Sequence, residues 1–273
     1  MTATDVVVAH LADRDSGLRL WVRSVGAVCW RGNLRTVRVP ALLFTVAFFP
    51  IFFLVAYSGL FPSITEIPGF PTDSIEEWFV PFSIVQAGAF SGLGAGFMTG
   101  NDIDMKFFDR LLLMPTSRTA VYIGTVLVSV LRAVAIAVPV LVIGILLGAR
   151  LHGGALGVIA ALVAVIGISV ISASFALGVM YRVKDQRVAP LFQVVIFLVL
   201  FSSTATVPVE VATGWLHTVA TYNPVTQILR LARQATLPSG FTWADTWPGV
   251  AVMVAMVGLM MVFALTGLRR TVP

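Results

Sequence analysis

The sequence predicts an all-α polytopic membrane protein with six transmembrane helices, an N-terminal amphipathic interfacial helix, and a re-entrant helix pair before the last span. Two observations predict this class. Of the 273 residues, 58% are hydrophobic and only 11% are charged, whereas a soluble domain carries about 25% charged residues. The apolar residues also gather into six segments, each near or above the ~20 residues that cross a hydrocarbon core. These features exclude a soluble fold.

The six predicted spans are separated by loops whose basic residues crowd onto every second one. The spans run over Pro40–Leu60, Phe79–Met98, Tyr122–Leu147, Ala155–Met180, Val188–Val207 and Pro248–Leu268. The basic residues of the alternate segments are Arg14, Arg19, Arg23, Arg31, Arg35, Arg38, Lys106, Arg110, Arg118, Arg182, Lys184, Arg187, Arg269 and Arg270. By the positive-inside rule these segments face the cytoplasm, so both termini are expected inside.

The first 38 residues are predicted to form a region of their own, a cytoplasmic tail followed by an interfacial helix, ahead of a six-helix domain over residues 39–273. At ~100° per residue, the basic side chains of the helix fall on one arc and Leu18, Trp21, Val22, Val25, Val28 and Cys29 fall on the other. The basic arc consists of Arg19, Arg23, Arg31, Arg35 and Arg38. This helix is either a simple membrane anchor or one that also touches a cytoplasmic partner.

The second predicted span carries a glycine ladder. Gly88, Gly92, Gly96 and Gly100 recur at every fourth residue, which places them on one helix face. Because glycine has no side chain, another backbone can approach this face closely. The sequence leaves open whether the approaching helix belongs to the same subunit or to a second one.

The loop after this span, from Asn101 to Ala120, is predicted to hold a short amphipathic helix over Asp104–Leu113, with Asn101 or Asp102 as its cap. We expect this helix to be exposed to the cytoplasm. Its aromatic residues, Phe107 and Phe108, are costly to expose unless they meet lipid or another protein.

A single charge, Arg132, lies within a predicted span. Its burial in lipid would cost roughly 3 kcal/mol or more, which makes it a candidate for a functional role. Two interpretations remain open. The long side chain could snorkel to the headgroups, or it could contact an anionic headgroup or an internal partner in the substrate pathway.

The long loop before the last span predicts two short helices, Val209–Ala220 and Pro224–Thr236, that dip into the outer leaflet or lie flat on it. Asn223 and Pro224 form a good helix start, with Asn as the cap and Pro in the first turn. In the second helix Val225, Ile228, Leu229 and Ala232 share one face, while Arg230 and Arg233 take another.

The chemistry that the sequence lacks excludes several functions. The only lysines, Lys106 and Lys184, do not follow glycine, so no glycine-lysine phosphate-binding loop exists and the chain by itself does not hydrolyse ATP. The three histidines are isolated and Cys29 is the only cysteine, so no metal site is expected. The net charge of +5 is explained by the cytoplasmic lipid headgroups rather than by nucleic acid.

Two segments, RLLLMPTSR at residues 110–118 and YNPVTQILRLAR at residues 222–233, together with the predicted topology, resemble the ABC-2 type permeases. The likeness is strongest to the daunorubicin-resistance type of actinobacterial exporter, which implies a bacterial plasma membrane. In that family the first segment would be the coupling helix seated in a cleft of the ATPase, and the second would belong to the re-entrant pair. The residues that the resemblance assigns to ATPase coupling are Asp102, Asp104, Lys106, Phe107, Phe108, Asp109, Arg110, Leu111, Leu112, Met114, Pro115 and Arg118.

The resemblance implies a permease subunit that pairs with a second copy or a sister permease and with separate ABC ATPase subunits, which would bind ATP and Mg. The cargo of such exporters includes lipids, lipid-linked glycans, drugs and natural products, and the apolar spans of this chain suit an amphipathic or lipid-like one. The alternative is an ATP-independent membrane protein, either a secondary transporter or an assembly factor. An ion-coupled transporter would be expected to keep carboxylates near the midplane, and no predicted span contains one.

Overall fold

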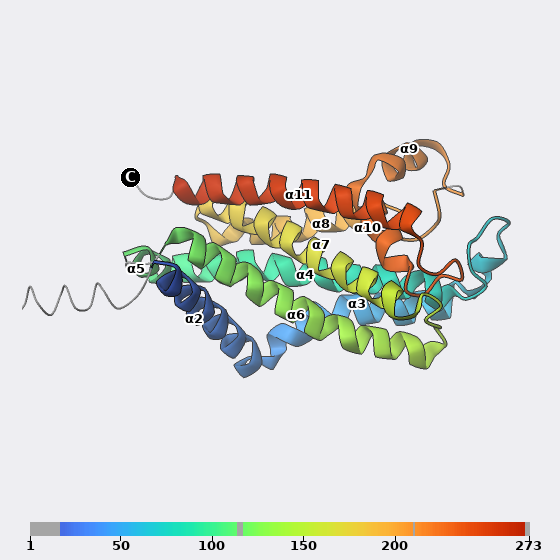
Figure 1. The fold of residues 1–273 in the computed structure, drawn as a ribbon, viewed down its shortest axis with the longest axis horizontal. Coiled ribbons are helices and arrows are strands. Elements are labelled where there is room, and N and C mark those ends of the chain that lie inside the picture. The colour runs from blue at the N-terminus through green and yellow to red at the C-terminus, as the bar shows by residue number, and fades with distance from the viewer. Residues whose placement is uncertain (1–16, 114–116, 210, 271–273) are drawn as a thin grey trace, which may run out of the picture.

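The computed structural model describes residues 17–113, 117–209 and 211–270, and every regular element within them is a helix. Most of the helices run side by side along an elongated bundle, with α2 and α5 at one end and α9 at the other (Figure 1). The elements are α2 (Gly17–Arg38), α3 (Pro40–Leu60), η1 (Pro62–Glu66), α4 (Ile75–Asp104), α5 (Phe107–Leu113), α6 (Arg118–Leu147), α7 (Gly154–Val183), η2 (Gln186–Val188), α8 (Ala189–Phe201), α9 (Gly214–Tyr222), α10 (Pro224–Arg233) and α11 (Trp243–Arg269). The all-helical class is confirmed.

Four of these helices, α4, α6, α7 and α11, are long and apolar enough to cross a membrane. Two further apolar helical stretches are shorter, Val46–Leu60 within α3 and Gln186–Phe201, which covers η2 and α8. The start of α2, the short α5 and the end of α11 all lie at the same end of the bundle (Figure 1). This arrangement agrees with the predicted alternation of the loops, while the count of six spans and their orientation stay predictions.

The predicted fifth span was too long, because α8 ends at Phe201 and not at Val207. The side chain of Asn223 reaches this end, where its Nδ2 donates to the carbonyl of Val199 at 2.7 Å and to Ser202 Oγ at 3.2 Å. Carbonyl groups in the last turn of a helix lack intrahelical partners. The helix can therefore end here, inside the protein, with one of those carbonyls satisfied.

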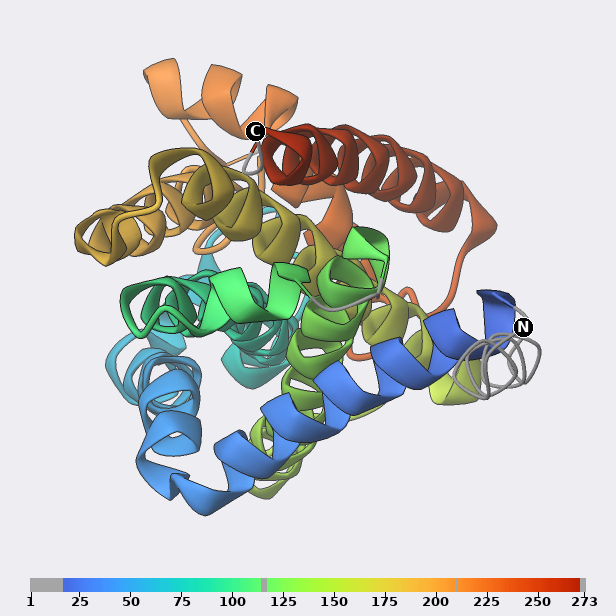
Figure 2. The same ribbon diagram turned by 90° about the vertical axis from the view of Figure 1, so that its left-hand side faces the viewer.

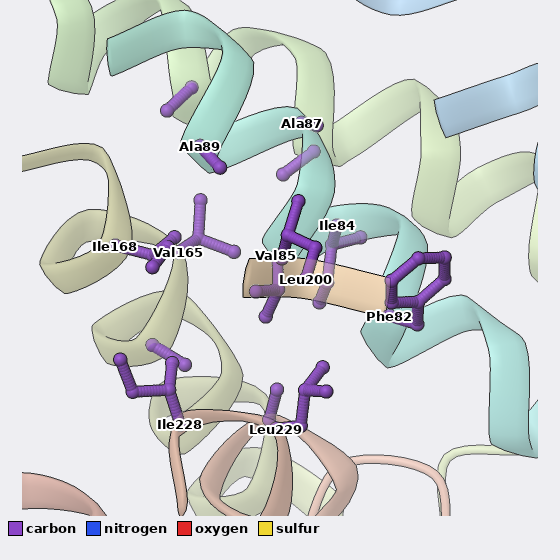
Figure 3. Packing of buried hydrophobic residues seen from close by; sticks show 14 of the residues in the cluster. Phe82, Ile84, Val85, Ala87, Ala89, Val165, Ile168, Leu200, Ile228 and Leu229 are labelled. Carbon is purple, nitrogen blue, oxygen red and sulfur yellow. The ribbon is translucent and has the colours of Figure 1, made fainter. Parts of the chain in front are cut away.

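Helix α4 is the centre of the bundle, and its whole apolar stretch is buried by its neighbours. Figure 3 shows Phe82, Ile84 and Val85 of this helix beside Leu200 of α8, with side chains of α7 and α10 close by. A helix that is apolar on all sides is stable only when other helices or lipid surround it. Here other helices of the same chain surround it.

The glycine ladder of α4 faces α7. A Cβ atom on Gly88 would lie 2.8 Å from the carbonyl oxygen of Val165, and one on Gly96 would lie 2.7 Å from Cβ of Ala176. At Gly92 an added Cβ would overlap Ser172 Oγ and would lie 2.5 Å from the carbonyl oxygen of Ser169. The ladder therefore serves a close helix contact within the subunit, the first of the two possibilities that the sequence left open.

Helix α2 lies obliquely across one end of the bundle and packs on α6 (Figure 2). The packing is close on both sides, because Cβ atoms added to Gly32 or Gly124 would overlap Val128 or Val28. Val25, expected on the membrane-facing arc, is buried in the protein. The apolar arc of this helix is therefore partly used against α6.

The segment before α11 forms two helices, but their bounds differ from those predicted. The first helix, α9, starts only at Gly214, whose φ of 63° favours glycine, and the second helix, α10, ends at Arg233. The predicted cap is confirmed, since the Asn223 side chain accepts a hydrogen bond from the backbone N–H of Val225 at 2.9 Å. The depth of these helices in a membrane stays a prediction.

The apolar face of α10 is also confirmed, because Val225, Ile228, Leu229 and Ala232 are all buried. Arg230, which shares the other face, is exposed. Arg233, in contrast, is only 3% exposed. Its guanidinium lies 3.3 Å from the ring centroid of Trp78 and donates to Thr204 Oγ1 at 3.0 Å, which compensates for the lost water.

The end of the bundle opposite α2 and α5 is held together through Glu77, which belongs to the first turn of α4 and is buried. Its carboxylate accepts from Thr72 Oγ1 at 2.6 Å and lies 2.9 Å from Nε2 of His152, at the start of α7. Its backbone carbonyl accepts from Thr236, which follows α10. Glu77 therefore joins the start of α4 to the turn before α7 and to the segment after α10.

Candidate functional site

The loop after α4 differs from its prediction in the position of the break between helices. Helix α4 continues to Asp104 and α5 begins at Phe107, so the predicted helix over 104–113 is replaced by a shorter one. Lys106 forms the break with a left-handed φ of 58°, and its N–H donates to the carbonyl of Ile103 at 2.9 Å. Asn101 and Asp102 lie in the last turns of α4, so neither of them caps α5.

Asp102 joins α4 to α2. Its carboxylate accepts from Arg31 at 2.6 Å and from Arg35 at 3.4 Å, and the residue is only 8% exposed. The guanidinium of Arg31 also lies 4.4 Å from the ring centroid of Phe107 in α5. We call this group, Arg31, Arg35, Asp102 and Phe107, the clamp, because it connects three helices at one end of the bundle.

The two phenylalanines of α5 are used mainly within the chain. Phe108 is 5% exposed and stacks on Tyr181 of α7, with 5.6 Å between ring centroids, and Leu111 beside it is also buried. The expectation that both rings project toward lipid or a partner is therefore wrong for Phe108, because α7 covers it. Phe107 is half-buried under Arg31.

The exposed surface of the segment from Asn101 to Ala120 is mixed and largely polar. Among the described residues, its exposed side chains are Asp104, Met105, Lys106, Arg110, Ser117, Arg118 and Thr119. Met105 stands out among them, because it is apolar and 69% exposed. Met114 and Pro115 lie outside the described residues, and so do the side chains of Asp109 and Leu112.

The N-terminal helix contributes two further positions to this end. Trp21 donates from its indole N–H to Thr119 Oγ1 at 3.1 Å, which attaches α2 to the first turn of α6. Arg19 and Arg23 are exposed. The basic arc is thus divided, with Arg31 and Arg35 turned to the clamp and the earlier arginines turned outward.

Arg132 is buried in the protein, with 4% of its surface exposed. It is fourteen residues into α6, roughly 21 Å along a helix of about 45 Å. Its Nη2 donates to the backbone carbonyl of Ser91 on α4 at 3.0 Å, while Nε has no hydrogen-bond partner in the described part of the chain. The side chain therefore turns inward and does not snorkel along the lipid-facing surface.

Space for this guanidinium exists because residue 94 is a glycine. A Cβ atom on Gly94 would lie 2.8 Å from Cζ of Arg132 and 2.5 Å from its Nη2. Gly94 is off the ladder that faces α7, so it serves a separate purpose on α4. That purpose is to let a cation approach the helix backbone.

Arg132 lines a cavity of about 410 Å³, within the ~300–1,000 Å³ range of small-molecule sites. Five helical elements besides α6 enclose it, and its walls combine basic, amide and apolar side chains. The lining residues are Arg35, Val46, Phe49, Phe90, Leu93, Gly94, Phe97, Met98, Asn101, Arg132, Gln186 and Gln193. We call it the basic cavity, because two arginines and no acid line it.

Sequence reasoning singled out Arg132 but missed its companions. Gln193 is an uncharged polar residue inside a predicted apolar span, and a search for such residues would have found it. No sequence signal could have brought Arg35 and Gln186 to the same cavity, because they come from α2 and η2. The helices that carry them are far apart in the sequence.

The described residues offer little for covalent or metal chemistry. No group of three or more His, Cys, Asp and Glu side chains among them could hold a metal ion. Burial raises the pKa of the Cys29 thiol, and a hydrogen bond from Asn33 offsets this only in part. A raised thiol pKa lowers the fraction of reactive thiolate.

A family assignment follows from comparison with known proteins. Residues 23–237 match the model of the family described as ABC-2 type transporter. This chain belongs to that family. The matched range includes α2 from Arg23 onward, the clamp, the basic cavity and both segments on which the resemblance was based.

Two relatives of this ABC-2 permease are informative. It is 31% identical over 240 residues, 86% of this chain and 81% of the relative, to the daunorubicin resistance ABC transporter permease protein DrrB1 of Streptomyces coeruleorubidus. It is 27% identical over 210 residues, 75% of this chain and 70% of the relative, to the proposed transport permease ycf38 of Porphyra purpurea. ABC-2 permeases are transmembrane subunits that are not catalytic themselves and that work with ATPase subunits.

Proposed function

We propose that this chain is the transmembrane subunit of an ATP-binding cassette exporter that moves an amphipathic, lipid-like or drug-like substrate outward. Separate ATPase subunits would bind ATP and Mg and drive the movement, and a second permease copy or a sister permease would complete the pathway. The observation that carries the proposal is the physical connection between the exposed cytoplasmic segment and the basic cavity.

This connection passes through the clamp. A force on α5 reaches Phe107, which lies against Arg31, and Arg31 shares the carboxylate of Asp102 with Arg35. Arg35 in turn lines the basic cavity. A rigid-body shift of α5 would therefore move a charged wall of the cavity, which is what switching between inward and outward access requires.

The surface that would receive the ATPase is the exposed face of the segment around α5. Met105 offers an apolar side chain whose burial would contribute about 1.5–3 kcal/mol, and Lys106 and Arg110 offer charges for the rim. Phe108 is already covered by α7, so it supports α5 from behind. Within the coupling set, the expected contact therefore moves from Phe108 to Lys106 and Arg110, and Met105 is added to it.

The test places a glutamate on this face, with a matched control for the charge reversal at the other end of the bundle. Arg110→Glu and Met105→Glu should insert normally, yet retain at least about tenfold less ATPase in pull-downs of the tagged permease. Arg150→Glu makes the same change of charge at an exposed arginine that follows α6, and it should retain the parental amount.

ATP-dependent uptake of a fluorescent amphiphile into inside-out vesicles should fall in the same order as the retained ATPase. If Arg110→Glu and Met105→Glu both retain ATPase as the parent does, the proposed surface is wrong. If no ATPase associates with the parental chain, the exporter proposal fails and an ATP-independent membrane protein is the better interpretation.

A further inference from the structure

The guanidinium of Arg132 is a buried cation without a counter-charge in the described part of the chain. The acids in ion pairs there are Asp102 and Glu77, and their partners are Arg31, Arg35 and His152. Arg132 itself makes one hydrogen bond, to the carbonyl of Ser91. Since a guanidinium has five N–H donors, most of its hydrogen-bonding capacity is unused.

A buried guanidinium with unused donors and no counter-charge is unfavourable unless another group compensates its charge. Carbonyl dipoles such as that of Ser91 compensate only in part, and Nε has no partner among the described residues. Because the effective dielectric constant is low inside a protein, an anion placed next to Arg132 would be attracted far more strongly than at the surface. The open space beside this residue is the basic cavity.

The walls of the basic cavity are arranged for a molecule with a polar head and an apolar body. Arg132 and Arg35 provide the two charges, and Gln193 provides an amide that can donate to an oxyanion. Phe49, Phe90 and Phe97 provide an apolar surface in the same cavity. Rings of Phe49 and Phe90 are in edge contact, with 6.0 Å between their centroids, so they form one continuous wall.

The two arginines differ in how freely water reaches them. Arg132 is nine-tenths buried, whereas the side chain of Arg35 is 37% exposed and already shares Asp102. Arg35 is therefore suited to attract an anion from the cytoplasmic side, and Arg132 to hold it within the bundle. The planar fork of an arginine binds phosphate, sulfonate or carboxylate through two parallel hydrogen bonds, which a lysine cannot do.

From these observations we propose that the basic cavity selects amphiphiles with an anionic head, whose oxyanion pairs with Arg132 and whose apolar part lies along the phenylalanine wall. The occupant is a phosphate-, sulfonate- or carboxylate-bearing amphiphile, either a resident anionic lipid or the exported molecule itself. This inference rests on the proposed function only where the occupant is taken to be cargo, since selective binding can be measured without an ATPase.

The test is a competition between two lipids with the same acyl chains and different head groups, one with a net negative charge and one zwitterionic. The purified full-length chain in a neutral detergent is mixed with equimolar dioleoylphosphatidylglycerol and dioleoylphosphatidylcholine, and native mass spectrometry measures the first bound lipid. We expect the parental protein to prefer the phosphatidylglycerol by at least about tenfold. Arg132→Gln should lose most of this preference, and Arg132→Lys should keep only part of it.

Arg38→Gln is the matched control. It removes one positive charge from an exposed arginine at the end of α2, next to the membrane but outside the cavity, and the preference should persist. If Arg132→Gln does not fold, Gln193→Glu decides, because it places a counter-charge in the cavity and should abolish the preference. An equal affinity of the parent for both lipids would overturn the proposal, as would an unchanged preference in Arg132→Gln or in Gln193→Glu.

A second measurement separates the two possible occupants. In proteoliposomes that contain the ATPase, ATP-dependent movement of a fluorescent phosphatidylglycerol between leaflets would identify the anionic amphiphile as cargo, and selective binding without movement would identify a resident lipid. Transport of a neutral amphiphile without anion selectivity would overturn the inference and leave the exporter function intact. Selective binding of the anionic lipid with no associated ATPase would contradict the exporter function and leave the anion-binding inference intact.

Discussion

The contact between α4 and α7 allows a quantitative prediction for Gly92. A Cβ atom at this position would overlap Ser172 Oγ and would lie 2.5 Å from the carbonyl oxygen of Ser169 and 2.7 Å from the backbone nitrogen of Ala173. Ordinary contacts of this kind are about 3.4–4 Å. Because two of the three atoms belong to the backbone of α7, the helices must move apart to accept even one methyl group.

The expected cost of Gly92→Ala follows from two opposing effects. Overpacking of a close contact costs about 1–3 kcal/mol, and replacing glycine by alanine in a helix recovers about 0.5–1 kcal/mol. We therefore expect a net loss of stability of up to about 2.5 kcal/mol. Gly258 of α11 is the control, because a methyl group added there would have no neighbour within 4 Å. In Gly258→Ala only the higher helix propensity of alanine applies, and it favours the folded state.

Thermal unfolding of the two variants in one detergent, followed by tryptophan fluorescence, provides the measurement. Gly92→Ala should unfold several degrees below the parental chain, and Gly258→Ala should unfold at or slightly above it. Adding Ser172→Ala to the first variant removes only the side-chain oxygen and should restore part of the loss. A Gly92→Ala protein as stable as Gly258→Ala would refute the close packing of α4 on α7.

Two further predictions concern the clamp and the topology. Asp102→Asn should weaken both arginine pairs and cost about 1–3 kcal/mol, and ATP-driven transport should fall while the ATPase still co-purifies. Transport at the parental rate in this variant would show that the clamp does not transmit force. In a Cys29→Ser background, Thr213→Cys should react with an impermeant thiol reagent from outside intact cells, and Asp185→Cys should not, since the positive-inside rule places it in the cytoplasm. Labelling of Asp185→Cys from outside would contradict the six-span topology.

Prediction from the sequence succeeded where structure depends on local periodicity. The helical class follows from long apolar segments, and the buried face of α10 follows from Val225, Ile228 and Leu229 at helical spacing. The cap formed by Asn223 was predictable for the same reason, since a cap and the N–H that it satisfies are two residues apart. These features need no knowledge of distant contacts.

The family resemblance added the expectation of a coupling segment and an ATPase partner. It could not establish which side chains of that segment are available, and the two rings chosen from the sequence illustrate the difficulty. Phe108 looked exposed because charged residues surround it in the chain, yet Tyr181, more than seventy residues later, covers it. A ring is hidden or exposed according to what packs against it.

The tertiary structure alone decided the character of the site. The sequence identified Arg132 as a charge within a span, but the direction of its side chain depends on the space left by Gly94 and on the carbonyl of Ser91. The same holds for Arg35, which reaches the basic cavity only because α2 lies across α6 and meets Asp102. Local patterns fix which residues are polar, whereas the cavity that they share is created by helix packing between segments far apart in the chain.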